Sequence, residues 1–190
     1  YCENGWYNTK TNISQFQNNA YITTEDYLLE GDSLFYNKEL KYGKAMKNVV
    51  VIDTAEQITI FGGLAEYFEE EKLVEITDKP LLEITLEQDT LYVNADKFIS
   101  NQKDGVKKML AYKNVSIFKT DLQGKCDSLR YSISDSILEM YNKPIIWIDE
   151  LQITSDSLQF LIQHGRIKRM FLKPNPIIIS KVEPPSCQPG

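Results

Sequence analysis

The sequence predicts an all-β protein in which similar units are stacked along the chain. Short runs of alternating apolar and polar residues recur throughout the 190 residues, as expected for strands with one buried face. Clusters rich in glycine and charged residues separate these runs, and no window of helical length keeps an apolar stripe at helical spacing. Blocks of sequence also return at a nearly fixed distance, which is typical of stacked supersecondary units.

The repeat has a period of 60 to 66 residues. The matching blocks are 45–49 with 111–115, 79–80 with 143–144, and 89–96 with 149–156. The distance between matching blocks shrinks at the turns, whereas the strand-like blocks keep their lengths. We therefore expect two repeats, at about 45–98 and 111–158, and a function carried by a long continuous surface or groove rather than by one catalytic pocket.

Strands and turns can be assigned in chain order from the alternation. Strands are predicted at Leu34 and Tyr36; Leu82, Ile84 and Leu86; Leu91 and Val93; Leu138 and Met140; Ile146 and Ile148; Leu151 and Ile153; and Leu158 and Phe160. Turns are predicted at Glu30-Gly31-Asp32, Phe61-Gly62-Gly63, Lys103-Asp104-Gly105, Gln123-Gly124-Lys125 and Gln163-His164-Gly165. Residues 65–73 come closest to a helical pattern, but Glu69-Glu70-Glu71 indicates a solvated hairpin tip.

A shorter motif, Asp-Ser/Thr-Leu-x-aromatic, begins at Asp32, Asp127 and Asp156, and a close variant begins at Asp89. Aspartate and serine can bond local backbone amides where a strand begins. The leucine and the aromatic residue two places later then share one face of the strand. The motif therefore predicts four strand entries.

Both ends of the chain depart from the period. Gly5-Trp6-Tyr7 indicates the close of a unit, and 171–179 the opening strand of an uncompleted one. We expect one β domain over 1–183 and a flexible, proline-rich tail over 184–190. The chain begins without methionine or a signal-type apolar segment, so we expect any export signal to lie outside it.

The composition favours some classes of partner over others. Hydrophobic residues make up 42% of the chain, enough for a core, and the longest apolar runs are strand-sized. The net charge of −6 argues against a nucleic-acid partner, which needs clustered basic residues. Arg166, Lys168 and Arg169 form only a short basic stripe, which we interpret as a solvated strand face.

Catalytic and metal sites find little support. Cys2, Cys126 and Cys187 lie far apart without zinc-ligand spacing, allow at most one disulfide, and leave the redox compartment open. The only histidine, His164, sits in a predicted turn with no second histidine to support a triad or metal role. The recurring aspartates lack the several oxygens in one short segment that a calcium loop needs. Paired carboxylates for glycoside hydrolysis would have to be unique, whereas a repeat predicts equivalent carboxylates in every unit. We expect a non-enzymatic protein without a cofactor or metal.

The remaining candidate is the row of apolar residues on the inner face of the predicted strands. Either the row is an ordinary sandwich core, or two facing sheets leave a slot for acyl chains, since apolar ligands need apolar walls. Alternation alone does not separate these two possibilities. The candidate groove residues are Leu34, Tyr36, Val49, Val51, Ile58, Ile60, Leu82, Ile84, Leu91, Val93, Val115, Ile117, Leu129, Tyr131, Leu138, Met140, Ile146, Ile148, Leu151, Ile153, Leu158 and Phe160.

Several motifs resemble one known family. They are Gly5-Trp6-Tyr7-Asn8-Thr9-Lys10-Thr11, 29–36 (LEGDSLFY), 43–49 (GKAMKNV), 89–96 (DTLYVNAD), and 120–129 (TDLQGKCDSL) with Met140-Tyr141. Over residues 5–179 the chain resembles the OstA-like proteins, relatives of the LptA, LptC and LptD N-terminal jelly rolls of lipopolysaccharide transport. Members of that family also carry a signal peptide or membrane anchor and further repeats. This chain shows neither, so we expect it to be an internal piece.

The resemblance implies an elongated antiparallel β-jelly roll in which two sheets are folded like a V or taco. It implies a place in the periplasm or cell envelope, with association to the outer membrane left open. Its partners would be lipopolysaccharide or a similar lipid inside a hydrophobic groove, and other jelly-roll modules or a second copy at the edge strands. The family has no sequence motif for lipid contact. The resemblance therefore implies only that the residues alternating in phase with Leu34, Leu91, Leu129 and Leu158 face inward, and a strand bulge would reverse this phase. The alternative is a solidly packed jelly roll that serves as a scaffold and binds only protein.

Overall fold

A computed structural model describes residues 1–23, 27–53, 57–86, 89–103, 106–163 and 166–181. Within these ranges the chain forms seventeen β-strands and no helix, so the all-β prediction is confirmed. In the described part of the chain there is accordingly no helix of the length and apolarity that crossing a bilayer requires. The predicted tail at 184–190 lies outside the described residues.

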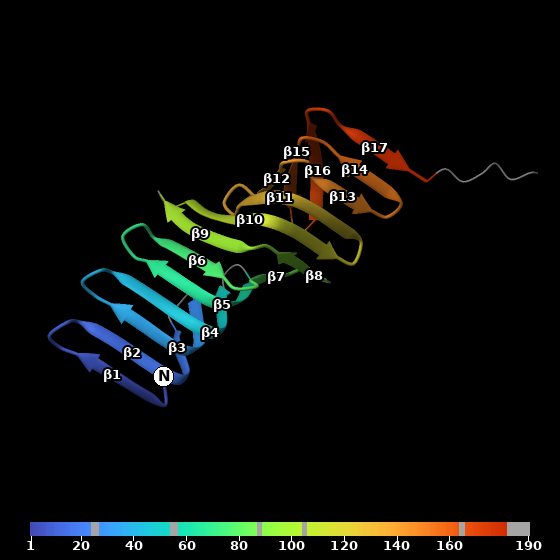
Figure 1. Ribbon diagram of the computed structural model, residues 1–190. Helices are drawn as coiled ribbons and strands as arrows, with labels where there is room; N and C mark the ends of the chain where they lie inside the picture. Colours follow the sequence, from blue (N-terminus) through green and yellow to red (C-terminus); the bar gives the residue numbers. More distant parts are fainter. Residues whose placement is uncertain (24–26, 54–56, 87–88, 104–105, 164–165, 182–190) are drawn as a thin grey trace, which may run out of the picture.

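The strands rise like a staircase from β1 at one end to β17 at the other (Figure 1). Their bounds are β1 Asn4–Asn8, β2 Ile13–Thr23, β3 Tyr27–Asn37, β4 Tyr42–Asp53, β5 Ile58–Phe68, β6 Leu73–Thr77, β7 Leu81–Thr85, β8 Thr90–Asn94, β9 Lys97–Lys103, β10 Val106–Lys119, β11 Leu122–Ser132, β12 Ile137–Tyr141, β13 Ile145–Ile148, β14 Leu151–Thr154, β15 Ser157–Gln163, β16 Arg166–Lys173 and β17 Ile177–Ser180. The hairpin tip predicted at Glu69-Glu70-Glu71 lies between β5 and β6.

All strand pairs are antiparallel and belong to one hydrogen-bonded ladder, which is folded lengthwise into two walls. A long strand contributes to both: on β4, residues 42–46 pair within one wall and 49–53 within the other. Wall A consists of β1, 13–17, 33–37, 42–46, 64–68, β6, β9, 106–112, 128–132, β12, β15 and β16. Wall B consists of 20–23, 27–31, 49–53, 58–62, β7, β8, 115–119, 122–126, β13, β14 and β17. This arrangement agrees with the expected V of two sheets.

A line of corners marks the fold between the walls. On alternate passes of the chain, the corner residues have left-handed backbone torsions with φ between 48° and 63°: Asn18-Asn19, Lys47-Asn48, Asp78-Lys79, Lys113-Asn114, Asn142-Lys143 and, singly, Asn175. The strand pairing shifts register at Asn18-Asn19, Lys47-Asn48 and Lys113-Asn114. Asparagine tolerates this conformation better than most residues. Lys47 and Lys113, 66 residues apart in the two matching sequence blocks, therefore occupy the same place in the corner line.

Asparagine side chains on the corners donate hydrogen bonds to an acidic side chain of the preceding pass. The donor–acceptor pairs are Asn48–Asp32 at 3.0 Å, Asn114–Asp96 at 2.8 Å, Asn142–Asp127 at 3.1 Å and Asn175–Asp156 at 2.9 Å. Two of the four predicted strand entries are thereby corrected, because Asp32 and Asp127 are corner residues inside β3 and β11. Asp89 and Asp156 do directly precede β8 and β15.

Three predicted turns are wrong because their residues lie at corners inside long strands. Residues 30–32, 61–63 and 123–125 lie inside β3, β5 and β11, where glycine accompanies a bend rather than a chain reversal. Gly63 shows why glycine is needed: a Cβ there would lie 2.0 Å from Asp78 Oδ2 on the adjacent corner. The predicted turns at 103–105 and 163–165 lie mainly outside the described residues, which end and resume around 104–105 and 164–165.

The corner also decides which side chains face inward. A corner of two left-handed residues preserves the alternation, so Ala45 and Val49 of β4 are both buried on the inner face. A corner of one residue shifts it, so β11 changes from Cys126 to Leu129 across Asp127. The inner faces together form one continuous apolar core along the array.

Candidate functional site

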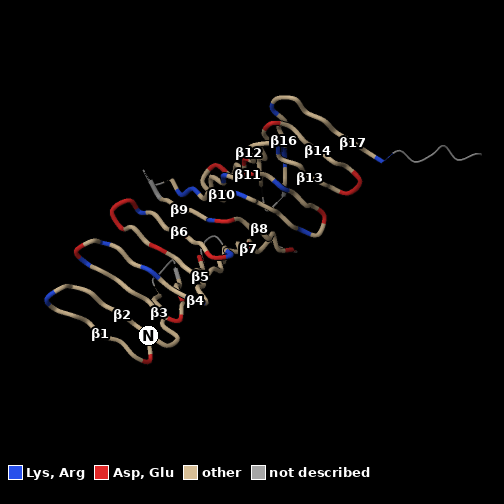
Figure 2. The backbone as a smooth tube through the Cα atoms, in the orientation of Figure 1, with Lys and Arg blue, Asp and Glu red and all other residues tan. Residues whose placement is uncertain are grey.

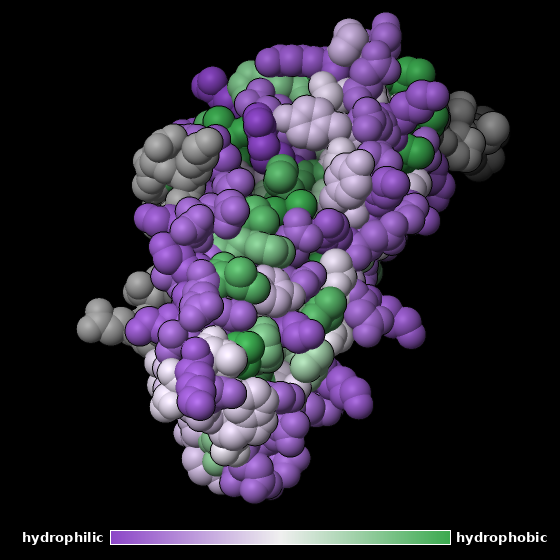
Figure 3. Space-filling view, turned by 60° about the vertical axis from the view of Figure 1, so that its left-hand side comes forward, coloured by the Kyte–Doolittle hydropathy of each residue, from purple (hydrophilic) through white to green (hydrophobic). Residues whose placement is uncertain are grey.

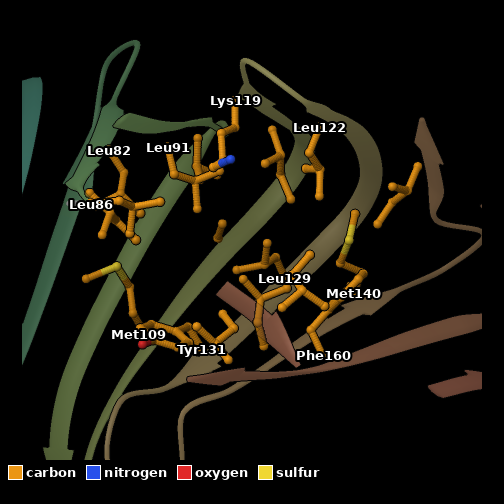
Figure 4. Close-up of a pocket in the computed structure, with 18 of the residues that line it drawn as sticks. Leu82, Leu86, Leu91, Met109, Lys119, Leu122, Leu129, Tyr131, Met140 and Phe160 are labelled. Carbon is orange, nitrogen blue, oxygen red and sulfur yellow. The ribbon is translucent and has the colours of Figure 1, made fainter. Parts of the chain in front are cut away.

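A cavity of about 860 Å³ lies between the walls in the C-terminal half of the array. Its lining comes from wall B between β7 and β13 and from wall A between β9 and β16. The volume falls within the ~300–1,000 Å³ typical of small-molecule sites. Figure 4 shows Leu82 and Leu91 of wall B across the space from Leu129 and Tyr131 of wall A.

The interior of the cavity is apolar. Phe98, Met140 and Ile146 are among the lining residues that are at most 1% exposed. Met109 and Met140 add flexible thioether side chains, which adapt readily to the shape of an apolar ligand. An interior of this composition suits hydrocarbon and offers little to a polar substrate.

The charged groups that line the cavity, Asp89, Lys119 and Asp121, lie at its rim, where strands of wall B begin or end. The Lys119 ammonium lies 3.5 Å from Asp89 Oδ2 and also pairs with Asp121. The hydrogen bond to Asp121 raises the pKa of Lys119. The hydrogen bond from the Thr90 backbone amide lowers the pKa of Asp89. Both groups therefore stay charged near neutral pH, and the rim is suited to the polar end of an amphiphile.

Apolar surface is also visible from outside, between polar margins. In the space-filling view, hydrophobic residues (green) form an interrupted column with hydrophilic residues (purple) on both sides (Figure 3). Among the lining residues, Ile167 is 42% exposed, so the cavity reaches the surface at β16. At this end of the array, the three isoleucines of β17 are also 55–57% exposed.

The N-terminal half of the groove is packed. Ala20, Leu34, Ala45 and Ala65 are 1–5% exposed, and all residues that line the cavity lie beyond residue 81. Small side chains on the inner faces allow the two walls to approach closely. Phe16 lies over Gly5 at the N-terminal end, where a Cβ on the glycine would be 2.7 Å from the phenylalanine ring.

Of the 22 candidate groove residues, twelve line the cavity, seven are buried in the core elsewhere, and three belong to neither group. Those that line the cavity are Leu82, Ile84, Leu91, Val93, Ile117, Leu129, Tyr131, Leu138, Met140, Ile146, Ile148 and Phe160. Those buried in the packed core are Leu34, Val49, Ile58, Ile60, Val115, Ile153 and Leu158. Tyr36 and Val51 are partly buried, and Leu151 is 38% exposed at the start of β14.

Sequence reasoning missed other lining residues. They are Thr85, Leu86, Asp89, Phe98, Met109, Ala111, Lys119, Asp121, Leu122, Ser136, Ile162 and Ile167. Phe98, Met109 and Ala111 lie in strands whose polar and charged neighbours obscure the alternation. The repeat carried a usable signal, because Ala111 matches Ala45, which is also buried.

The other sequence candidates lie away from this cavity. Cys2 and Cys126 are free thiols, and burial raises the pKa of Cys126 to about 12. Within the described ranges, no group of three or more histidine, cysteine or acidic side chains is arranged to hold a metal ion. His164 and Cys187 lie outside the described residues.

Comparison with known proteins found similarity among solved structures. No protein-family model matches the chain, and no curated protein matches it. Among solved structures, the chain is similar to LptH, described as the LptA homologous periplasmic component of the conserved lipopolysaccharide transport device from Pseudomonas aeruginosa. The similarity has a TM-score of 0.31 and 10% sequence identity, and it covers 83% of this chain and 95% of LptH.

Proposed function

We propose that this chain is a non-enzymatic module of lipid transport that shields acyl chains in the groove between its walls. The observation that carries the proposal is the cavity of about 860 Å³, apolar inside and charged only at its rim. An acyl chain in the cavity would contact Leu129, Phe160 and the other lining residues, and its head group would stay at the solvent-exposed rim. The candidate residues of the packed half, such as Leu34, would contact lipid only if the walls part there.

The energetics fit a carrier. Burial of hydrocarbon contributes roughly 0.8 kcal/mol per methylene, so a chain of about a dozen carbons gains on the order of 10 kcal/mol before entropic losses. Because this contribution is nondirectional, neighbouring positions along an apolar groove bind almost equally well. A lipid can then be held strongly and still slide.

The proposed ligand is lipopolysaccharide or a similar lipid, and the proposed location is the periplasm or cell envelope. The support is the match of motifs such as 29–36 and 89–96 to the OstA-like pattern, together with a groove of suitable chemistry. On the same two grounds, the proposed role of the module is in the assembly of the outer membrane.

Photo-crosslinking tests the ligand. A benzoylphenylalanine at Phe160, which lines the cavity, should label the acyl chains of added lipopolysaccharide. The same probe at Gln159, the preceding residue on the opposite face of β15, should label them only at background level. Equal labelling at the two positions, or none at Phe160, would refute lipid binding in the cavity.

The proposal includes docking to like modules through edge strands. β1 at one end is exposed along its whole length and pairs only with β2 among the described strands; at the other end, β17 pairs only with β14. Unpaired strand edges accept a further strand by backbone hydrogen bonding. Ile178→Pro removes a backbone donor from β17 and should reduce concentration-dependent association in analytical ultracentrifugation. Leu40→Lys, in a loop, is the control; equal association of both variants would argue against docking at this edge.

A protein-binding scaffold is the second candidate, and the packed N-terminal half of the groove favours it. A scaffold would keep its edge-strand association but would show no lipid labelling at Phe160. Added lipid would also leave the intrinsic fluorescence of Trp147 unchanged.

A further inference from the structure

Within the described part of the chain, one ion pair connects the two walls across the groove. The Lys107 ammonium on wall A pairs with the Asp53 carboxylate on wall B. β4 pairs with β3 and β5, and β10 with β8, β9 and β11, so the strands that carry the two residues are not hydrogen-bonded to each other. Their contact therefore spans the space between the walls.

Both residues end inward-facing rows at the mouth of the groove. On β10 the row runs from Ala111 through Met109 to Lys107, and on β4 it runs from Val49 to Asp53. The side chains are 19% exposed for Lys107 and 7% exposed for Asp53. A charge pair with so little exposure is weakly screened, and loss of one partner leaves the other charge poorly solvated.

The pair lies at the N-terminal boundary of the cavity. Met109 and Ala111, in the same row as Lys107, line the cavity, whereas Val49 and Val51, in the row of Asp53, do not. Beyond this boundary the inner faces carry small residues: Ala45 and Ala65 are buried neighbours on wall A, and a Cβ on Gly31 of wall B would lie 3.5 Å from the Ala45 Cβ. If the walls separated there, these small side chains would leave an apolar channel continuous with the cavity.

The repeat shows that this pair is not a general requirement of the fold. The position that matches Asp53 in the second repeat is Lys119, whose partners Asp89 and Asp121 lie on its own wall. The position that matches Lys107 in the first repeat is Lys41, which pairs with Glu70 of its own wall at 3.1 Å. Figure 2 shows that many of the other charges likewise lie in the loops between strands.

At the β16 end of the cavity, no ion pair between described residues joins the two walls. Ile167 of β16, which lines the cavity, is 42% exposed, and its neighbours Lys168 and Arg169 are also exposed. The groove is therefore closed at one end of the cavity and open at the other.

We infer that the Asp53–Lys107 pair is a latch that confines the lipid to the C-terminal half of the groove and must open before an acyl chain enters the N-terminal half. This inference rests on the proposed function. The two ends of the groove then differ. Lipid enters and leaves the cavity at the β16 end, whereas its passage toward β4 requires the Asp53–Lys107 pair to separate.

The test uses two photoprobes and two variants. Benzoylphenylalanine at Phe160 reports lipid in the cavity, and the same probe at Leu34 reports lipid in the N-terminal half. With the native pair, Phe160 should be labelled and Leu34 should remain at background. Lys107→Glu places two carboxylates at the mouth, and labelling at Leu34 should rise to a level comparable with Phe160. The combined change Asp53→Lys and Lys107→Glu restores opposite charges and should return labelling at Leu34 to background.

Three results would overturn the latch: Leu34 labelled in the protein with its native pair, Leu34 unlabelled in folded Lys107→Glu, or labelling at Leu34 that persists after the charges are exchanged. If Lys107→Glu does not fold, as judged by circular dichroism, Lys107→Met removes the attraction without repulsion, and the same outcomes decide. Absence of label at Phe160 in every variant refutes the proposed function itself, and the latch with it.

Discussion

At the scale of single residues, the corners between the walls depend on which atoms fit in a confined space. Gly63 is the corner residue of β5, where β3 and β11 have Asp32 and Asp127. The side chain of Asp78 occupies the space that a Cβ at Gly63 would need. At this corner, therefore, β5 carries a glycine, and the aspartate is Asp78, which lies between β6 and β7.

Gly63→Ala should lower the free energy of unfolding by about 1–3 kcal/mol, because the new Cβ overlaps the Asp78 side chain. Adding Asp78→Gly should recover most of the loss, since residue 78 has a φ of 63° that glycine adopts easily. Gly31→Ala is the matched control: its Cβ would be 3.5 Å from the nearest heavy atom, and its stability should change little. Urea denaturation of the four proteins measures this, and equal losses for Gly63→Ala and Gly31→Ala would contradict the account of the corner.

The thiol of Cys126 should be inert in the folded protein. Burial raises its pKa to about 12, so almost none is thiolate at pH 8 and the rate should rise only as the pH approaches 12. In a variant with Cys2→Ser and Cys187→Ser, iodoacetamide should modify Cys126 only after denaturation in guanidinium. A folded protein that reacts at the rate of a free thiol would show that the strand pairing around Cys126 is wrong.

Alternation alone predicted the inward residues well where a strand stays within one wall, as at Leu82 and Ile84. It could not follow a strand through a corner. The single corner residue Asp127 shifts the inner face of β11, whereas two left-handed residues, as at Lys47-Asn48, preserve it on β4. Apolar patterning does not encode this difference. Phe98 and Met109 were missed because polar neighbours surround them in sequence.

At the scale of elements, the recurring unit is a long strand that crosses from one wall to the other at a corner. The sequence placed turns at Gly31, Gly62 and Gly124 because glycine next to charged or polar residues usually marks a reversal. Here the ladder continues past each of them, and the reversals occur elsewhere, as at Glu69-Glu70-Glu71. The sequence repeat was more informative than the turn signals, since matching blocks occupy matching places at the corners.

Asn114 tests the energetics of a corner. Its φ is 51°, and its side chain donates to Asp96 at 2.8 Å. Asn114→Ala and Asn114→Gly both remove the hydrogen bond, but alanine also pays about 1 kcal/mol or more for the left-handed conformation. Thermal unfolding should therefore show Asn114→Ala as the less stable of the two. An Asn114→Gly protein that is as unstable as Asn114→Ala would mean that the torsion angle contributes little.

At the scale of the whole molecule, the array is asymmetric although its units are alike. The N-terminal half is packed around alanine and Leu34, whereas the C-terminal half encloses the cavity. The sequence predicted the fold class and a continuous apolar interior, but it could not tell a filled interior from an open one. That distinction depends on how far apart the walls stand, and the Asp53–Lys107 pair joins opposite walls.

The most direct measurement of the central claim is contact quenching by brominated acyl chains. In a background with Trp6→Phe and Trp147→Phe, a tryptophan replaces either Tyr131, which lines the cavity, or Tyr112, which is 49% exposed on the outer face of β10. A brominated lipid should quench the tryptophan at 131 at concentrations that leave the one at 112 unaffected, because bromine quenches only at close range. Equal quenching at both sites, or none at 131, would contradict a groove that holds hydrocarbon.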